Sequence, residues 1–312
     1  MPTASSPGSK LAYTAGHFEL SIDDHKSTAY VKSIDGGFVK SSVIDEGIGP
    51  TNMRVKHTST VEIDPFSIEF GLSGAGEVLK WIQQSWKMEP SRRNGQITHA
   101  DFNLKATYEH QFFHALIAET TFPTLDGSSR EAAYMKIKVQ PERIFTRKEA
   151  GRGADIGGGP TTKQKAWLPS AFRLTIDGLK GLEYTNKIDS FTIKQGIKKF
   201  YYGQERFPEI EPTKIEFPNL SCTIALEHAD QLLRWGRESL IQGRPDPRVQ
   251  RTGAIEFLSP SRTRTLFRVN LDQVGLHNLQ IVQSTANSEQ IKRVKFDLFV
   301  GAMELDTMAG FE

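Results

Sequence analysis

The sequence has little cysteine, little net charge and no long hydrophobic run, and each shortage excludes a class of protein. Cys222 is the single cysteine, which excludes an internal disulfide and a multi-cysteine metal site. Lys and Arg number 39 against 37 Asp and Glu, a formal charge of +2, which argues against a strongly basic nucleic-acid reader. No apolar run reaches ~18 residues, so we expect no membrane-spanning helix.

The N-terminal residues Met1–Lys10 are rich in Ser, Pro and Gly and have no apolar core. We therefore expect no secretory signal and synthesis in the cytoplasm. Hydrophobic residues make up 38% of the 312 residues and charged residues 24%, a composition that can bury a core. At ~100–200 residues per domain, this length fits two domains or one large one.

The chain contains an internal repeat with an offset of 154 residues. Phe18–Asp23 (FELSID) reappears as Phe172–Asp177 (FRLTID). Identical residues continue at this offset without a gap as far as the pair Ser85 and Ser239. They include Tyr30/Tyr184, Ile34/Ile188, Asp35/Asp189, Lys40/Lys194, Glu62/Glu216, Ser67/Ser221, Leu72/Leu226, Ala75/Ala229, Leu79/Leu233 and Trp81/Trp235. The sequence therefore indicates a tandem duplication.

Each copy carries one segment with helical periodicity. The apolar positions recur at i, i+3, i+4, i+7 and i+11, which predicts one amphipathic helix per copy. These positions are Ala75, Val78, Leu79, Ile82 and Trp86 in the first copy, and Ala229, Leu232, Leu233, Gly236 and Leu240 in the second. Trp81 and Trp235 lie beside this face and are either core residues or interface anchors.

The segment before each helix alternates as a strand does, and its phase slips once. The slip falls at Asp64-Pro65 in the first copy and at Pro218-Asn219 in the second. An extra residue beside a proline is typical of a bulge or a strand corner. Its presence at the same place in both copies supports the duplication.

Most of the remaining sequence reads as antiparallel strands. In the first copy we expect strands at Phe18–Asp23, Ala29–Ile34, Gly37–Val43, Val55–Leu72, Ile97–Tyr108, Phe112–Thr121 and Ala132–Pro141. In the second we expect Phe172–Asp177, Leu182–Ile188, Ser190–Lys194, Lys214–Leu226, Thr252–Leu258, Thr265–Asp272, Gln280–Gln283 and Ile291–Glu304. The predicted fold is mainly β, with two tandem antiparallel β-barrel or sandwich domains, each flanked by one α-helix.

The predicted organisation has four parts. Residues 1–14 form a flexible N-terminus, 15–145 the first β domain, 146–166 a Gly-rich linker and 167–312 the second β domain. The linker prediction depends on five glycines and a proline, with no apolar periodicity, between Thr146 and Gln164. Within it, Gly157–Gly159 lacks the flanking strand and helix of a nucleotide-binding loop.

Several residues could carry chemistry, and each has a plainer structural explanation. His110 and His114 would suit a metal on a helix, but they lie in a predicted strand. Asp23-Asp24-His25 is either a carboxylate–histidine pair or a hairpin turn. Gly71, Gly74 and Gly76 precede a helix without phosphate-loop spacing, so a helix start capped by Ser73 is simpler.

Two further features also favour structural roles. Cys222 falls in an apolar phase and is more simply a small core residue than a nucleophile. The basic residues of the second copy could bind nucleic acid, but their alternation within strands favours a solvated face; they are Arg251, Arg262, Arg264, Arg268, Lys292, Arg293 and Lys295. We therefore predict no catalytic, cofactor-binding or metal residues, no cofactor and no enzyme.

Each half resembles the tail tube protein family of contractile phages and related injection systems. The resemblance rests on the order of a Phe-x-Leu-x-Ile-Asp strand, a second strand, a long loop, a long bent strand, a helix and a closing hairpin. The helix carries Leu79-Lys80-Trp81 in one copy and Leu233-Arg234-Trp235 in the other. The resemblance covers residues 15–145 and 168–306, and the family pattern has a single such domain per chain.

The resemblance implies a structural virion or injection-particle component whose β-barrels join into hexameric rings of an inner tail tube around a lumen. With two domains per chain, three chains could make one pseudo-hexamer, or each chain could place one domain in each of two stacked rings. The expected partners are neighbouring rings, sheath and baseplate proteins, with nucleic acid or cargo only in the lumen. Assembly would take place in the bacterial cytoplasm.

Three alternatives remain at this point. The chain could be a baseplate, tube-initiator or symmetry-adaptor protein, a ligand-binding β-sandwich module, or an enzyme with a site in one half only. The segments Ile44–Met53 and Gln195–Pro212 read as long hairpin loops that could contact other rings. We accordingly expect deletion of Gln204–Glu211 to leave the domain folded and to block polymerisation.

Overall fold

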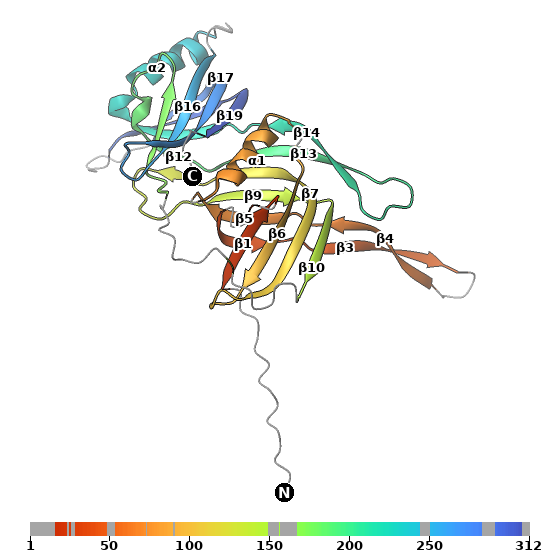
Figure 1. Cartoon of the computed structure of the whole chain (residues 1–312). Helices are drawn as coiled ribbons and strands as arrows, with labels where there is room; N and C mark the ends of the chain where they lie inside the picture. Colours follow the sequence, from red (N-terminus) through yellow and green to blue (C-terminus); the bar gives the residue numbers. More distant parts are fainter. Residues whose placement is uncertain are drawn as a thin grey trace.

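The computed structural model describes residues 16–23, 25, 29–48, 54–72, 74–89, 91–148, 156, 167–243, 250–282 and 291–307. Two β-barrels dominate this part of the chain, each with a helix at its side (Figure 1). The predicted mainly-β fold with two barrels and a helix in each half is confirmed. The division at residues 146–166 stays a prediction, since most of that segment lies outside the described residues.

The first barrel is closed by six strands. Their order is β7-β6-β1-β2-β5-β9, and β9 pairs back onto β7. The strands are β1 (His17–Ile22), β2 (Tyr30–Asp35), β5 (Phe66–Gly71), β6 (Arg93–Ala100), β7 (Ala106–Phe122) and β9 (Met135–Gln140). After Pro141, β10 (Arg143–Arg147) continues along β7. Leu20, Phe66, Ile68 and Phe112 fill the interior and are fully buried.

The second barrel repeats this plan and is almost closed. Its order is β11-β16-β17-β18-β15-β12, and the short strand β8 (Leu125–Asp126) of the first half pairs onto β12. The strands are β11 (Phe172–Ile176), β12 (Thr185–Ile188), β15 (Leu220–Ala225), β16 (Arg251–Leu258), β17 (Thr265–Ile281), β18 (Arg293–Phe299) and β19 (Ala302–Thr307), which pairs with β17. A 3-10 turn, η1 (Leu182–Tyr184), connects β11 to β12.

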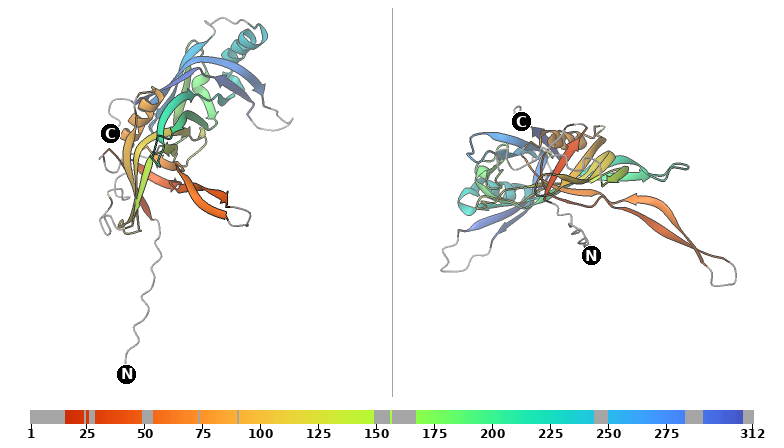
Figure 2. Two further views of the ribbon diagram at one scale, coloured as in Figure 1. Left: turned by 90° about the vertical axis from the view of Figure 1, so that its right-hand side faces the viewer. Right: turned by 60° about the horizontal axis from the view of Figure 1, so that its bottom comes forward.

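Each half also sends out a β-hairpin, and both project to the same side of the molecule (Figures 1 and 2). The first consists of β3 (Val39–Gly47) and β4 (Arg54–Ile63), the second of β13 (Phe191–Phe200) and β14 (Glu209–Glu216). The predicted phase slips are confirmed, because β4 ends before Asp64-Pro65 and β14 ends before Phe217-Pro218. The loop predicted at Gln195–Pro212 is wrong, since more than half of it belongs to the ladder of β13 and β14. Of the loop predicted at Ile44–Met53, Ile44–Gly47 belongs to β3, and residues 49–53 lie outside the described residues.

The helix α1 (Gly76–Trp86) buries the predicted face together with Trp81, whose Nε1 donates to the Ser91 carbonyl at 2.6 Å. In the second half, η2 (Leu226–His228) leads into α2 (Asp230–Gly236) and a π-helical turn, η3 (Arg237–Ile241). Ala229, Leu232 and Trp235 are buried there. The prediction is wrong for Leu240, which is 41% exposed.

The predicted strands Ile97–Tyr108 and Phe112–Thr121 have the wrong bounds, because the chain forms β6 and the longer β7 instead. The chain turns at residues 101–105, where Asp101 Oδ1 accepts from the amides of Asn103 and Lys105, both at 2.9 Å. The long strand β7 then continues through a bulge at His114, whose φ is 50°. Similarly, the two strands predicted at Thr265–Asp272 and Gln280–Gln283 form the single strand β17, with a matching bulge at Gln273 (φ 54°). The predicted final strand is divided, since β18 and β19 are separated by Val300-Gly301.

Candidate assembly interface

The histidines and carboxylates singled out in the sequence have separate structural partners. His110 Nδ1 lies 2.8 Å from Thr146 Oγ1, and His114 Nδ1 lies 2.9 Å from Glu142 Oε2. Both histidines lie in β7, so the predicted strand is confirmed at this position. Asp23 closes the turn after β1, where the Ile22 amide donates to the His25 carbonyl at 3.0 Å, while Asp24 lies outside the described residues. Across the described ranges, no cluster of three His, Cys, Asp or Glu side chains could hold a metal ion.

Cys222 and the glycine-rich segment take structural positions. Cys222 is 1% exposed, and burial raises the pKa of its thiol, as expected of a core residue. The N-cap of α1 is Ala75, without a side-chain hydrogen bond, and Ser73 lies outside the described residues. Gly157–Gly159 also lies outside them. Neither α1 nor α2, among the described segments, is long and apolar enough to cross a membrane.

Four of the basic residues named in the second half are engaged with acidic side chains or backbone carbonyls. Arg268 Nη2 lies 2.9 Å from Asp306 Oδ2, and Lys295 Nζ lies 3.9 Å from Asp189 Oδ2. Arg251 and Arg262 donate to the carbonyls of Asp177 and Ser170. Their arrangement fits local ion pairs better than a phosphate-binding surface.

The most extensive constellation lies where the two barrels meet. We call this contact the inner joint; it comprises the end of β7 and α1 from the first half, and β13 and β19 from the second. Strand β13 pairs antiparallel with β7 through Phe191↔Phe122, Thr192↔Thr121, Ile193↔Thr120 and Lys194↔Glu119. In return, β8 of the first half pairs with β12 of the second. Strand exchange thus joins the halves in both directions.

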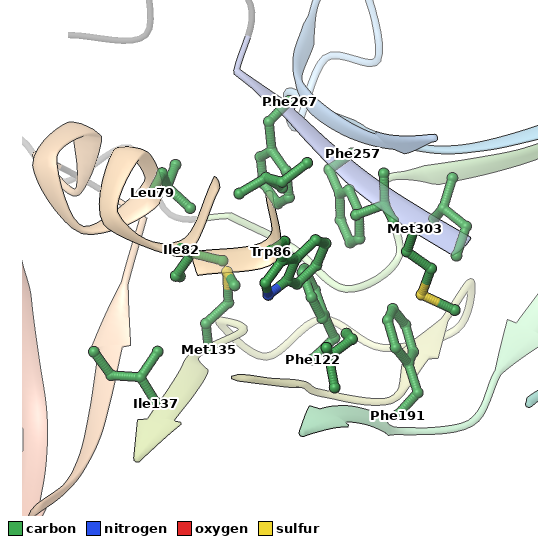
Figure 3. Close-up of a cluster of buried hydrophobic side chains, with 14 of the residues drawn as sticks. Leu79, Ile82, Trp86, Phe122, Met135, Ile137, Phe191, Phe257, Phe267 and Met303 are labelled. Atoms are coloured by element: carbon green, nitrogen blue, oxygen red, sulfur yellow. The ribbon is translucent and has the colours of Figure 1, made fainter. Parts of the chain in front are cut away.

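An aromatic cluster fills the inner joint (Figure 3). Phe122 stacks on Phe191 with ring centroids 4.7 Å apart and lies 5.5 Å from Phe257. Trp86, at the end of α1, meets Phe122 edge-on at 6.1 Å. Phe122 and Phe257 are fully buried. Because stacked and edge-on rings attract beyond the apolar area they bury, this cluster stabilises the joint strongly.

Polar contacts fix the end of α1 against the second half. Ser85 Oγ donates to Gln195 Oε1 at 2.7 Å, and both side chains are buried. Gln83 Nε2 donates to the Leu305 carbonyl at 3.0 Å. Lys87 Nζ lies 2.9 Å from Glu304 Oε1, and this hydrogen bond raises the pKa of Lys87. The buried pair is the geometrically demanding contact, because a buried polar atom without its partner is costly.

Glu142, 7% exposed, connects the second hairpin to the first barrel. Its Oε1 accepts from the Ile210 amide of β14 at 3.1 Å, and its Oε2 meets His114 at 2.9 Å. Arg92 Nε lies 3.6 Å from the same carboxylate. Ile210 itself is fully buried, so deletion of Gln204–Glu211 would remove this contact between β14 and the first barrel, and we no longer expect the deletion to leave the fold intact.

The two hairpins differ sharply in exposure. Phe191 and Ile193 of β13 are 3% and 2% exposed because they pack against the first barrel. In the first hairpin, Phe38 and Val39 are 64% and 55% exposed. Within the described residues, β3 pairs with β4 alone. The first hairpin therefore leaves free the edge that the second hairpin uses.

The first barrel has a histidine and a tyrosine where the second barrel has two phenylalanines. His99 stacks on Tyr108 at 4.1 Å, as Phe257 stacks on Phe267 at 4.3 Å. His99 is 7% exposed, and neither ring nitrogen has a hydrogen-bond partner among the described residues. Burial, with a smaller contribution from His110, lowers the pKa of His99 to about 4.

The inner joint is not predicted by the sequence patterns, although Trp81 and Trp235 are both buried. The available signal was the replacement of Gly37 and Val39 by Phe191 and Ile193 within a repeat otherwise similar there. Larger apolar residues at these positions in the second copy indicate that only the second copy buries them against another part of the protein.

Several solved structures resemble part of this chain. A chain of the sheath-tube complex of an extracellular contractile injection system, PVC, in the extended state is 17% identical, with 46% of this chain and 99% of that chain covered and a TM-score of 0.40. A chain of the tube-terminating cap of the anti-feeding prophage is 15% identical, with 47% and 97% covered and a TM-score of 0.41. Hcp1 from Flavobacterium johnsoniae is 15% identical, with 46% and 96% covered and a TM-score of 0.28. No protein-family model and no curated protein matches the sequence.

Proposed function

We propose that this chain is a structural protein of the inner tube of a contractile injection system or phage tail, and that it acts by forming closed rings. The observation that carries the proposal is the inner joint, in which one barrel adds the hairpin of the next to its own β7. Within the described residues, the equivalent edges, that of β3 in the first half and that of the end of β17 in the second, have no strand partner. A chain that contains one such joint and exposes the two complementary surfaces of a second is suited to head-to-tail association with other copies.

The lateral geometry of the inner joint supports three chains per ring. The two barrels are joined edge to edge by strand pairing, the relation that neighbours within one ring require. Placing the two barrels in stacked rings would need an end-to-end contact instead. Three chains would then supply six barrels, arranged as a pseudo-hexamer around a lumen.

The number of chains per particle tests this proposal. The purified full chain, at concentrations from nanomolar to tens of micromolar, is measured by mass photometry and imaged by negative-stain microscopy. We expect species of three chains and annular particles with six lobes, and stacks of such rings at high concentration. A protein that remains a monomer throughout this range would contradict the proposal.

A role as tube initiator or symmetry adaptor in a baseplate is a second candidate, favoured by the two unlike barrels in one chain. A ring of three such chains has threefold symmetry in its chemistry and approximate sixfold symmetry in its shape. It could therefore bind a trimeric component on one side and a hexameric ring on the other. Rings that fail to stack on each other but cap a tube would support this role. In either role the partners would be neighbouring rings, sheath and baseplate proteins, after assembly in the bacterial cytoplasm.

A further inference from the structure

The second half exposes a face equivalent to the one that the first half buries in the inner joint. Through the repeat, Lys87 corresponds to Ile241. Strands β7 and β17 share their bulges, at Ile117/Glu119 and at Leu276/Asn278, so Phe122 corresponds to Ile281. Ile241 and Ile281 are 80% and 58% exposed. We call this surface the helix-side face; it consists of Leu240, Ile241 and the edge Asn278–Ile281.

The first half exposes the complementary face. Val39 occupies the position of Ile193, which the inner joint buries. Phe145 pairs with Gln111, three residues before the bulge at His114, and Glu304 pairs with Asn270, three residues before the bulge at Gln273. Phe145, 62% exposed, therefore corresponds to Glu304. We call this surface the hairpin-side face; it consists of Phe38, Val39, Lys40 and Phe145.

We propose that the helix-side face of one chain binds the hairpin-side face of a second copy, in the register of the inner joint. This outer joint pairs Phe38 with Gln280, Val39 with Leu279 and Lys40 with Asn278. Its occupant is another copy because the inner joint already contains both halves of the same contact, made by equivalent residues. Both edges are available, since β3 pairs with β4 alone and β17, beyond Val274, pairs with β18 alone within the described residues.

The outer joint differs from the inner joint at one informative position. The inner joint has the ion pair Lys87–Glu304 at 2.9 Å. The outer joint has Ile241 and Phe145 at the two equivalent positions, both apolar and both largely exposed in the single chain. Both equivalent positions are thus apolar where both inner-joint positions are charged, which matches a contact between Ile241 and Phe145. A charged residue facing an apolar partner would lose hydration without compensation, so the mixed pairings are disfavoured.

A cysteine pair tests the register, and the test rests on the proposed ring assembly. The inner-joint counterpart of Phe38 and Gln280 is the pair Thr192 and Thr121, whose hydroxyls are 2.9 Å apart. Cysteines at such opposed positions satisfy disulfide geometry. We expect the full chain with Phe38→Cys and Gln280→Cys to oxidise into covalent species of up to three chains on denaturing gels. The slipped pair Phe38→Cys with Ile281→Cys, whose side chains point to opposite faces, is the control and should give no such ladder.

A charge exchange tests the contact between Ile241 and Phe145. Ile241→Lys or Phe145→Glu alone should raise the concentration needed for rings at least tenfold. The double variant should restore assembly to within about threefold, because it recreates the ion pair of the inner joint. Tyr184→Lys changes another exposed aromatic residue, 57% exposed and outside both faces, and should assemble as the unmodified chain does.

The outcomes separate the two proposals. If the unmodified chain never forms rings, the proposed function fails and the joint with it. If the unmodified chain forms rings while both single variants assemble normally, or the slipped cysteine pair cross-links instead, the outer joint is overturned and the ring function stands. Circular dichroism of each variant should be unchanged, since Ile241, Phe145, Phe38 and Gln280 are exposed in the single chain.

Discussion

His99 in the first barrel occupies the position that Phe257 has in the second. Both residues pair with an aromatic residue of the next strand, Tyr108 or Phe267. The imidazole is buried without a hydrogen-bond partner among the described residues. An ionisable ring thus stands where the other copy has a hydrocarbon ring, and this difference makes the first barrel sensitive to acid.

Stability should fall as the pH is lowered from 6.5 towards 4. The pKa of His99 is about 4 in the folded chain, against about 6.5 for an unperturbed histidine. In this window the unfolded chain binds a proton that the folded chain excludes, so stability is full above pH 6.5 and is lost below it. One such group changes the free energy of unfolding by at most ~1.4 kcal/mol per pH unit.

The measurement is urea unfolding at several pH values. His99→Phe should flatten the dependence, although His110, whose pKa is also lowered by burial, should leave a residual slope. His57→Phe, at an exposed site on β4, is the matched control. If the free energy of unfolding of His99→Phe fell with pH as steeply as that of the unmodified chain, His99 would not be the cause of the acid sensitivity.

Phe122 is fully buried in the inner joint and contacts Trp86, Phe191 and Phe257. Phe122→Ala should lower the free energy of unfolding by ~3–5 kcal/mol, because it leaves a cavity between rings that no neighbour can fill. Phe145→Ala, at an exposed phenylalanine, should change it by less than ~0.5 kcal/mol in the dilute monomer. Chemical denaturation measures both, and a loss below ~1 kcal/mol for Phe122→Ala would contradict this account.

At the scale of elements, the bulges of the long strands β7 and β17 organise each barrel. They allow one strand to pair with different neighbours along its length: β7 with β6 and β10 in its first part, and with β9 and β13 in its last. Without the bulge at His114, the last part of β7 would run in another direction and its edge would not reach β13. The bulge therefore positions the edge that forms the joint.

Gln273 holds the bulge of β17 with a φ of 54°, a conformation that glycine adopts more readily. Gln273→Gly should be neutral or stabilise by up to ~1 kcal/mol, whereas Gln273→Val should destabilise by ~1–3 kcal/mol. Thermal unfolding of the two variants measures the difference. Equal melting temperatures for Gly and Val would show that the left-handed conformation is not retained in solution.

The elements that local patterns specify were predictable from the sequence. The helical face of Ala75, Val78 and Leu79 and the phase slip at Asp64-Pro65 depend on nearest neighbours, so periodicity reveals them. The turn at residues 101–105 was missed because its signal is one carboxylate, Asp101, that bonds two amides. The bulge at His114 also disrupts the alternation on which strand prediction depends.

The inner joint could not be derived from local patterns. Its partners, such as Ser85 and Gln195 or Gln83 and Leu305, lie far apart along the chain and form single contacts without any sequence period. Only the comparison of copies carries information, as in the change from Val39 to Ile193. Contacts between distant strands have to be read from the structure.

At the scale of the whole molecule, the two halves should remain together without their covalent connection. A site for a specific protease is inserted between Gly157 and Gly159, in the predicted linker, and the chain is cut under native conditions. Because β13 pairs with β7 and β8 pairs with β12, we expect the fragments to co-elute on size exclusion and to separate only in denaturant. The same cut in Phe122→Ala should release the fragments, and early separation in the unmodified chain would contradict the strength of the joint.

The exchange of β8 and β13 between the halves also bears on the order of assembly. Tethered partners meet at effective concentrations in the millimolar range, independent of how much protein the cell has made. In the proposed ring, contacts between chains would depend on the amount of protein synthesised, and ring closure would wait until enough copies accumulate. The duplication would thus separate a fast, unimolecular step from a slow, concentration-dependent one, and the expression level would determine when rings form.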